Sequence, residues 1–280
     1  MRIQYGAAVI MMQKRDSGLS MAVGFVMVLL VIAMIIGMWA VVGVPEQIRD
    51  AEDYHAIEVT NSFLDYKIAV DNQRVHAMTG LNISMLIPAA SGYSDGALFM
   101  DEGVGTLRVL LGSTENTYDI SRLYTTFGTT NTRVGYEGGG VFRNDYGSAV
   151  WVTPPSINID KDGSDLDITM IIPEMHGAFA VGSSEGIPVE TGLVSSIPTY
   201  VNAPQDQMLT ITYTAEERWD ALLWSTFFNE TQILYQSEGV SITSTMPLPI
   251  TATLQITPPP GGVIYLTIIK PVYDVDVRRF

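Results

Sequence analysis

The chain has no cysteine, which excludes disulfides, thiolate metal sites and cysteine nucleophiles. It is also poor in charge, since 16% of its 280 residues are charged, against roughly 25% in ordinary soluble domains. Basic residues are scarce: 15 Lys and Arg stand against 30 Asp and Glu, for a formal net charge of −15. Such a chain repels phosphate backbones, so we expect no nucleic-acid partner.

Motifs of catalysis are missing as well. His55, His76 and His176 do not have the spacing of metal ligands. The glycine triplet that begins at Gly138 lacks the Lys of a phosphate-binding loop. No Ser/His/Asp set and no pair of catalytic carboxylates emerges from the spacing. We therefore predict that the chain is not an enzyme, has no catalytic residues and needs no cofactor, apart from a candidate calcium ion considered below.

What the chain does contain is one long hydrophobic run. Residues 21–44 read MAVGFVMVLLVIAMIIGMWAVVGV and carry no charge. A helix needs about 20 such residues to cross the bilayer core. A buried core helix seldom stays apolar for so long, and the apolar region of a cleaved secretory signal is shorter, roughly 7–15 residues. The run therefore predicts a helix in membrane lipid.

The flanks of the run indicate its direction. Arg2, Lys14 and Arg15 precede it, and acidic residues predominate immediately after it. By the positive-inside rule, the N-terminus lies in the cytoplasm and everything after residue 44 lies outside. Trp39, near the outer end, is a residue that favours the membrane interface. We expect a single-pass membrane protein with an extracellular C-terminal domain.

The junction between the leader and the run has a distinct layout. The letters KRDSG end at Gly18, and LSMAVGF begins at Leu19. This layout resembles the N-terminus of archaeal type IV pilin-like surface proteins, which carry a class III signal peptide. The resemblance implies cleavage by a prepilin peptidase between Gly18 and Leu19. It also implies that the helix of residues 19–44 remains in lipid or self-assembles into a filament core. Residues 135–155 resemble a further stretch of such proteins, whose glycine-rich turn lies between adjacent strands.

These patterns divide the chain into a cytoplasmic leader (1–18), a transmembrane or filament-core helix (19–45), an amphipathic juxtamembrane helix (46–78) and an extracytoplasmic β-rich domain (79–280). Pro45 is expected to kink or restart the helix. The juxtamembrane helix has one seam of residues three, four or seven positions apart. Its members are Ile48, His55, Val59, Ser62, Phe63, Tyr66 and Val70. The seam faces either neighbouring chains or the chain's own domain, and the sequence does not decide between them.

Beyond Gly80 the hydrophobic pattern changes to period two. Alternation is clearest in residues 165–170, 209–213 and 250–256, with Gly- and Pro-rich turns between such runs. The pattern predicts an α+β protein: a long N-terminal hydrophobic and amphipathic helix, followed by a mainly antiparallel, β-sandwich-like domain with one packed helix. The sequence contains no repeat of fixed period, so it does not predict a propeller or a solenoid. One sandwich and two small sheets both fit the pattern.

The packed helix is expected over residues 218–228. Thr214 and Glu217 have the spacing of a capping box, with Thr214 as N-cap. The predicted apolar face consists of Trp219, Leu222, Leu223 and Phe227.

An acidic stretch invites a calcium hypothesis. Asp160, Asp162 and Asp165 surround Gly163 as in the first half of a calcium loop, and they are the ligands expected if calcium binds. The position of the bidentate Glu is taken by Thr169, so a solvated acidic hairpin is the favoured alternative.

Two tripeptides match the N-glycosylation sequon on the predicted outer side. They begin at Asn82 and Asn229. We expect Asn229 to be the better exposed of the two.

The leading functional hypothesis is a pilin-like structural or adhesive surface protein. Its partners would be membrane lipid, further copies of the helix of residues 19–44, and a prepilin peptidase. A permanently anchored cell-surface domain that binds a ligand or protein is the alternative. An extracytoplasmic hydrolase is a second alternative, which no sequence motif supports.

Overall fold

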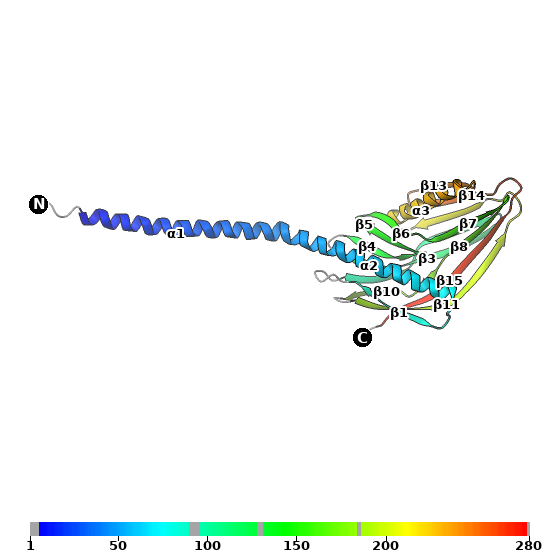
Figure 1. The fold of residues 1–280 in the computed structure, drawn as a ribbon, viewed down its shortest axis with the longest axis horizontal. Coiled ribbons are helices and arrows are strands. Elements are labelled where there is room, and N and C mark those ends of the chain that lie inside the picture. The colour runs from blue at the N-terminus through cyan, green and yellow to red at the C-terminus, as the bar shows by residue number, and fades with distance from the viewer. Residues whose placement is uncertain (1–5, 90–95, 128–130, 184–185, 279–280) are drawn as a thin grey trace. The chain divides into compact units, whose positions relative to one another are not determined.

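The computed structural model describes residues 6–89, 96–127, 131–183 and 186–278, with side chains from Met21 onward. The chain divides into two compact units, residues 1–50 and 51–280. The first unit is helical, and the second contains all the strands (Figure 1).

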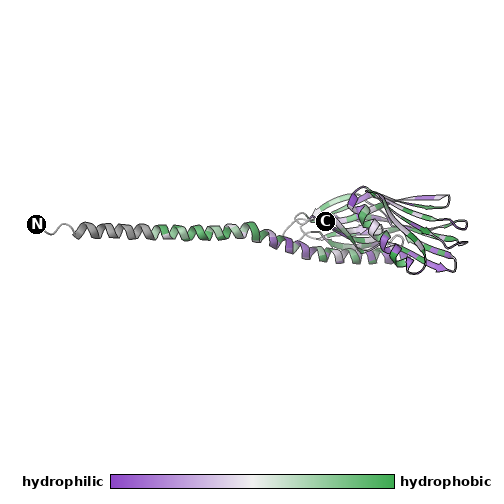
Figure 2. Cartoon of the chain, turned by 90° about the horizontal axis from the view of Figure 1, so that it is seen from above, coloured by the Kyte–Doolittle hydropathy of each residue, from purple (hydrophilic) through white to green (hydrophobic). Residues whose placement is uncertain are grey.

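The helix of the first unit carries apolar side chains on every face from Met21 to Val42. It consists of α1 (Gly6–Met38) and a short π-helical segment (Trp39–Gly43), after which α2 (Val44–Val75) begins. Figure 2 shows an uninterrupted hydrophobic colour from the first described side chains to the start of α2. The large apolar side chains from Met21 to Val42 are each between 46% and 80% exposed. Within the described residues, no face of the helix from Met21 to Val42 is buried.

The π-helical segment lies directly before Pro45. Proline has no N–H to donate and its ring crowds the preceding turn, so a local widening of the helix is an ordinary response. Gly43 allows the indole of Trp39 to approach closely, because a Cβ at this position would lie 2.9 Å from the Trp39 ring. The predicted interruption at Pro45 therefore takes the form of a π-helical turn.

The predicted seam of α2 is largely buried against the second unit, and two of its seven members, Ile48 and Ser62, are only half-buried. His55, Val59, Phe63, Tyr66 and Val70 are buried. The helix ends at Val75, three residues before the predicted end at residue 78, because Ala77 adopts a left-handed conformation (φ 48°). Of the two arrangements that the sequence left open, the chain shows the one in which the seam packs on its own domain.

The strands form two sheets rather than many small ones. The six-stranded sheet has the order β1 (Asn82–Pro88), β11 (Gly186–Asn202), β15 (Ile264–Val277), β8 (Asp165–Ile171) and β7 (Ser156–Asp162), with β9 (Glu174–His176) also paired to β15. Pairing is antiparallel except where β15 meets β8 and β9.

The nine-stranded sheet is antiparallel throughout. Its order is β13 (Ser241–Leu248), β14 (Thr251–Thr257), β12 (Leu209–Ala215), β2 (Gly96–Leu111), β3 (Thr114–Phe127), β4 (Thr132–Glu137), β5 (Gly140–Asp145) and β6 (Ser148–Thr153), with β10 (Phe179–Ser183) paired to β2. A long N-terminal helix followed by mainly antiparallel sheets confirms the predicted α+β class.

The remaining helix, α3 (Arg218–Gln236), packs across the nine-stranded sheet. It lies against β12, β13 and β14 and also against β6 (Figure 1). Since β13 and β6 stand at opposite ends of the strand order, the sheet must curl, and α3 fills the space between its ends.

The capping prediction for α3 is wrong. Thr214 belongs to β12, Glu217 is the residue before the first turn, and no side chain caps that turn. The helix runs to Gln236, eight residues beyond the predicted end. Of the predicted apolar face, Leu223 and Phe227 are buried, Trp219 is half-buried and Leu222 is exposed, and the buried face also includes Trp224 and Phe228. The reason is tertiary, because β-pairing of Thr214 with Thr106 and Thr251 extends the strand through the expected cap.

Two hydrophobic cores result, one around each helix of the domain. The α3 core joins Trp224, Phe227 and Phe228 to residues of both sheets, such as Leu254 and Ile268. The α2 core joins Phe63, Tyr66 and Val70 to residues that include Leu123 and Tyr273. Alternating residues of β8, β12 and β14 point into the α3 core, as their period of two predicted.

The glycine-rich stretch is the turn between β4 and β5. Glu137 pairs with Gly140, and the two residues between them, Gly138 and Gly139, have φ of 54° and 93°. Two positive φ values are the requirement of a type I′ hairpin turn. Gly138 also makes room for Trp224, whose ring would lie 2.8 Å from a Cβ at that position.

Candidate functional site

A buried ionic cluster joins α3 to the nine-stranded sheet. Arg122 in β3 donates from Nε to Glu137 Oε2 (2.5 Å) and from Nη2 to Asp220 Oδ2 (2.5 Å). Glu137 ends β4, and Asp220 lies in the first turn of α3. Arg122 is 4% exposed and both carboxylates are 0% exposed. A single guanidinium thus faces two carboxylates without access to water.

Neighbouring side chains complete the cluster. Tyr213 donates its hydroxyl to Asp220 Oδ2 (2.7 Å), and Trp224 donates Nε1–H to Glu137 Oε1 (2.8 Å). The Trp219 ring lies over the guanidinium of Arg122, 4.6 Å from its carbon to the ring centroid. These contacts satisfy most, but not all, of the buried polar atoms, since Asp220 Oδ1 has no hydrogen-bond partner among the described residues.

The excess of negative charge alters the protonation of the cluster. Burial raises the pKa of Asp220 well above its ordinary value, and the neighbouring Glu137 raises it further, although Arg122 acts in the opposite direction. Burial opposes the charge of Arg122, but Glu137 and Asp220 outweigh that effect and raise the pKa of the guanidinium. A proton retained on Asp220 relieves the repulsion between the two acids.

The cluster has residue types that are common in active sites, but a substrate cannot reach them. No lining residue of the cavities described here belongs to it, and its three ionic side chains are almost fully buried. A substrate could not reach these carboxylates without displacing α3. We therefore interpret the cluster as a clasp that fastens α3 to β3, β4 and β12.

Sequence reasoning missed this cluster. Its ionic residues are separated by 15 and 98 positions and come from a strand, a strand end and a helix. Arg122 itself could have indicated the cluster. It lies in the second half of β3, where most residues are buried, and a buried cation requires a partner of opposite charge.

An open groove lies between α3 and the connection from β6 to β7. It has a volume of about 480 Å³. Phe227, Leu234 and Tyr235 line it from α3, and Pro154 and Pro155 line it from the connection. Its polar lining residues include Lys67, Asn158 and Glu230. The groove thus combines apolar walls with several polar groups, as small-molecule sites do.

A smaller cavity adjoins this groove beneath α2. It has a volume of about 100 Å³ and is lined by Lys67, Asp71 and Arg74 from α2 together with Gly139, Ser156 and Ile171 from the sheets. We call it the α2 cavity. Lys67 and Ser156 line both the α2 cavity and the groove, so the two spaces are neighbours. No pattern along the chain indicates either space, since their walls come from segments far apart in the sequence.

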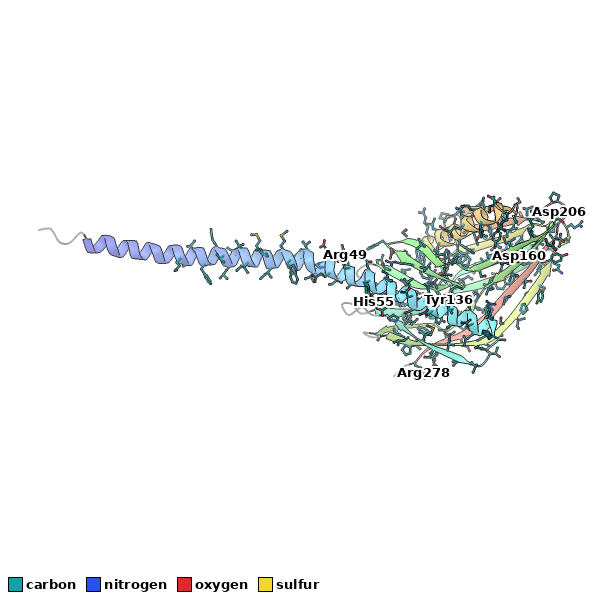
Figure 3. The ribbon with its side chains drawn as sticks, in the orientation of Figure 1. Arg49, His55, Tyr136, Asp160, Asp206 and Arg278 are labelled. Carbon is teal, nitrogen blue, oxygen red and sulfur yellow. The ribbon has the colours of Figure 1, made fainter. Side chains whose placement is uncertain are left out.

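The proposed calcium ligands lie in the hairpin of β7 and β8. Asp162 pairs with Asp165 across the two-residue turn, and Gly163 has the positive φ (64°) that the turn requires. Asp165 Oδ1 accepts a hydrogen bond from the backbone N–H of Val263 (2.9 Å), and Asp160 is exposed (Figure 3). Within the described parts of the chain, no group of three or more His, Asp or Glu side chains is placed to hold a metal ion.

The two sequons differ in a way that the sequence did not reveal. Asn82 is the exposed first residue of β1, and Ser84 is exposed as well. Asn229 is also exposed but lies within α3, where Thr231 is buried and donates its hydroxyl to the carbonyl of Phe227 (2.8 Å). Both asparagines are thus exposed, and the two tripeptides differ at their third residue, which is exposed at Ser84 and buried at Thr231.

The expected processing site falls inside α1. Gly18 and Leu19 have helical backbone, and their side chains lie outside the described part of the chain. Among the described residues, one helix is long and apolar enough to cross a membrane, and it lies near the N-terminus. This feature is compatible with single-pass anchoring.

Comparisons with known proteins place the domain in a family but assign no activity. A family of unknown function (DUF7289) matches residues 92–257, which is more than half of the chain. No curated protein matches, and no solved structure matches. The matched range runs from just before β2 to the end of β14 and includes the buried clasp.

Proposed function

The chain belongs to the family of unknown function DUF7289, and from that starting point we propose that it is a structural surface protein. Its N-terminal apolar helix anchors it in a membrane or assembles it into a pilin-like filament, and its β-rich domain is displayed outside the cell. The proposal includes no catalytic role. The observation that carries it is the exposure of apolar side chains around the whole helix from Met21 to Val42.

Water is a poor environment for that helix. Burying one large aliphatic side chain gains about 1.5–3 kcal/mol relative to leaving it exposed. The helix presents such side chains on every face, so partners are needed all round rather than on one stripe. Lipid supplies such partners, and so does a bundle of identical helices from further copies of the chain.

The charges near the helix support an outward-facing domain. Arg2, Lys14 and Arg15 precede the apolar run, whereas Glu46 and Asp50 follow it closely. Basic residues are retained on the cytoplasmic side of a membrane. The second unit also carries most of the acidic excess of the chain, which keeps a displayed domain hydrated and soluble.

The filament form of the proposal rests on the leader. The layout around Gly18 and Leu19 resembles that of archaeal type IV pilin-like proteins, in which a prepilin peptidase removes the leader before assembly. A helix can leave lipid only if neighbouring helices cover the same apolar surface. Self-association through residues 19–44 would meet that requirement.

A charge placed inside the helix tests the anchor. Ile32→Arg should move the full-length protein out of the membrane fraction or block its assembly, because a cation at mid-bilayer costs about 2.5–3.5 kcal/mol on insertion scales. Ile68→Arg is the matched control, since Ile68 is an exposed residue of α2 in the second unit. Wild-type protein that remains monodisperse without detergent would refute the proposal.

The permanently anchored binding domain is the second candidate function. It is favoured by the groove of about 480 Å³ beside α3, which a purely structural domain does not need. Mass spectrometry of sheared surface material separates the candidates. Filaments whose subunits begin at Leu19 support the pilin-like form. Monomers with intact Met1, recovered solely with detergent, support the anchored binding domain.

A further inference from the structure

One residue of the α2 cavity wall, Arg74, has a buried hydrogen-bonding group that the described residues do not satisfy. Nε of Arg74 is buried and has no partner among the described residues. The hydroxyl of Tyr136, a fully buried residue of β4, also has none. Native proteins pair the great majority of such buried atoms with protein, water or ligand. The unpaired N–H of Arg74 on the cavity wall therefore indicates a site that accepts something from outside the chain.

Tyr136 lies within electrostatic reach of the cavity wall. Its ring packs edge-on against Tyr66 of α2, with the centroids 5.6 Å apart. Burial raises the pKa of Tyr136 well above its ordinary value, Asp71 raises it further, and Arg74 lowers it. Two of the three charged residues that line the α2 cavity, Asp71 and Arg74, thus act on this hydroxyl, which indicates that it lies near the cavity.

The charge of the cavity is positive by one unit. Lys67 forms an ion pair with Asp71 at 2.7 Å. Arg74 is a second cation in the cavity lining, and Asp71 is the single carboxylate there, so the sum of the formal charges is +1. This local excess occurs in a chain whose formal charge is −15. A guanidinium with an unused N–H is a preferred partner of carboxylate oxygens. The charge and the donors together match one monovalent oxyanion.

The volumes of the α2 cavity and the groove limit which parts of a ligand each space can hold. The α2 cavity, at about 100 Å³, holds a carboxylate but not a larger group. The adjoining groove offers about 480 Å³ with apolar walls from Phe227, Leu234 and Pro154. We propose that the α2 cavity binds the carboxylate of a small organic acid whose apolar body lies in the adjoining groove. The proposal stands independently of filament assembly.

Benzoate is a suitable probe because it combines a carboxylate with a compact apolar body. Full-length protein in detergent micelles is titrated with benzoate by calorimetry, with protein-free micelles as the blank. Benzyl alcohol, which has the same ring without the charge, is titrated in parallel. We expect saturable heat with benzoate and at least ten-fold weaker binding of benzyl alcohol. Equal affinity for both compounds, or no saturable heat with benzoate, would overturn the proposal.

Substitutions at and away from the α2 cavity test whether benzoate binds there. Arg74→Gln should weaken benzoate binding at least ten-fold, whereas Arg108→Gln, at an exposed arginine paired with Glu115, should leave it unchanged. Ser156→Asp provides a second test that does not depend on the folding of the first variant, because Ser156 is exposed at the shared mouth. Its added charge should repel benzoate, and Ser148→Asp on exposed β6 is its control.

Unchanged affinity in both Arg74→Gln and Ser156→Asp would show that benzoate binds elsewhere and would refute the site. These measurements use dispersed protein in detergent. Their failure is therefore distinct from a failure of anchoring or assembly, which the membrane fractionation of Ile32→Arg reports.

Discussion

Nε of Arg122 lies 2.5 Å from a carboxylate oxygen of Glu137, at a place that water does not reach. The same guanidinium binds Asp220 at 2.5 Å and so connects β3 and β4 to the first turn of α3. A buried ion pair contributes little net stability compared with a well-packed apolar substitute, but the loss of one partner leaves an uncompensated charge. The consequences can be measured.

Arg122→Leu should destabilise the domain strongly. The substitution leaves Glu137 and Asp220 buried without their cation, and breaking a buried pair in this way costs about 3–5 kcal/mol of unfolding free energy. Urea unfolding of the detergent-solubilised protein measures the change. Arg108→Leu is the control, because Arg108 and Glu115 form an exposed pair and should contribute little. Equal effects of the two substitutions would contradict the interpretation of the cluster as a clasp.

Asp220→Asn should change the pH dependence of stability. Burial and then Glu137 raise the pKa of Asp220 above its ordinary 3.8, so the folded state holds this proton to higher pH than the unfolded state does. The corresponding stability is fully present below pH 3.8 and is lost as the pH rises through the folded pKa. The wild type should therefore lose stability relative to the Asn variant as the pH increases.

Urea titrations of both proteins at several pH values between acid and neutral check this sign. Other carboxylates titrate in the same range, so the informative quantity is the difference between the two proteins. A difference that is constant with pH, or that grows in favour of the wild type, would show that Asp220 is not protonated preferentially in the folded state.

Calcium should leave the domain unchanged. Asp165 already accepts a hydrogen bond from the backbone of Val263, and the bidentate ligand of a calcium loop is replaced by Thr169. We expect no heat on titration with millimolar calcium and the same thermal midpoint with calcium or a chelator. Saturable heat that disappears in Asp162→Asn would instead establish the hairpin as a calcium site.

Glycosylation, where the host performs it, should occur at Asn82 in preference to Asn229. Ser84 is exposed, whereas the hydroxyl of Thr231 is buried and hydrogen-bonded within α3. Acceptor tripeptides are normally found in accessible surface segments. Peptide mass spectrometry of the native protein measures the occupancy of each site. Asn82→Gln should remove most of the attached mass and Asn229→Gln little, and the reverse result would contradict this ranking.

Local pattern was sufficient for the helices of the N-terminal half and for many strands. The apolar run, Pro45 and the seam from His55 to Val70 each follow from residue spacing, because a helix brings residues three and four apart to one face. Leu166, Leu209 and Leu254 lie in runs of alternating residues and are buried in the α3 core, because alternate residues of a strand face the same side of the sheet.

The start of α3 shows where local pattern fails. Thr214 and Glu217 have the spacing of a cap, but cross-strand pairing with Thr106 and Thr251 outweighs a single capping bond. The strand therefore continues, and the helix buries Trp224 and Phe228 in place of Leu222.

The sequence by itself determined the apolar helix, the acidic and cysteine-free composition, and the α+β fold class, in which a long helix precedes mainly antiparallel sheets. These are properties of neighbouring residues, and their physics is local. The tertiary structure alone decided the clasp of Arg122, the α2 cavity and the different burial of Ser84 and Thr231 in the two sequons. Each depends on residues brought together from distant segments. Residue spacing along the chain does not predict which charged groups will lie side by side, or where cavities will form, once the two sheets pack with the two helices.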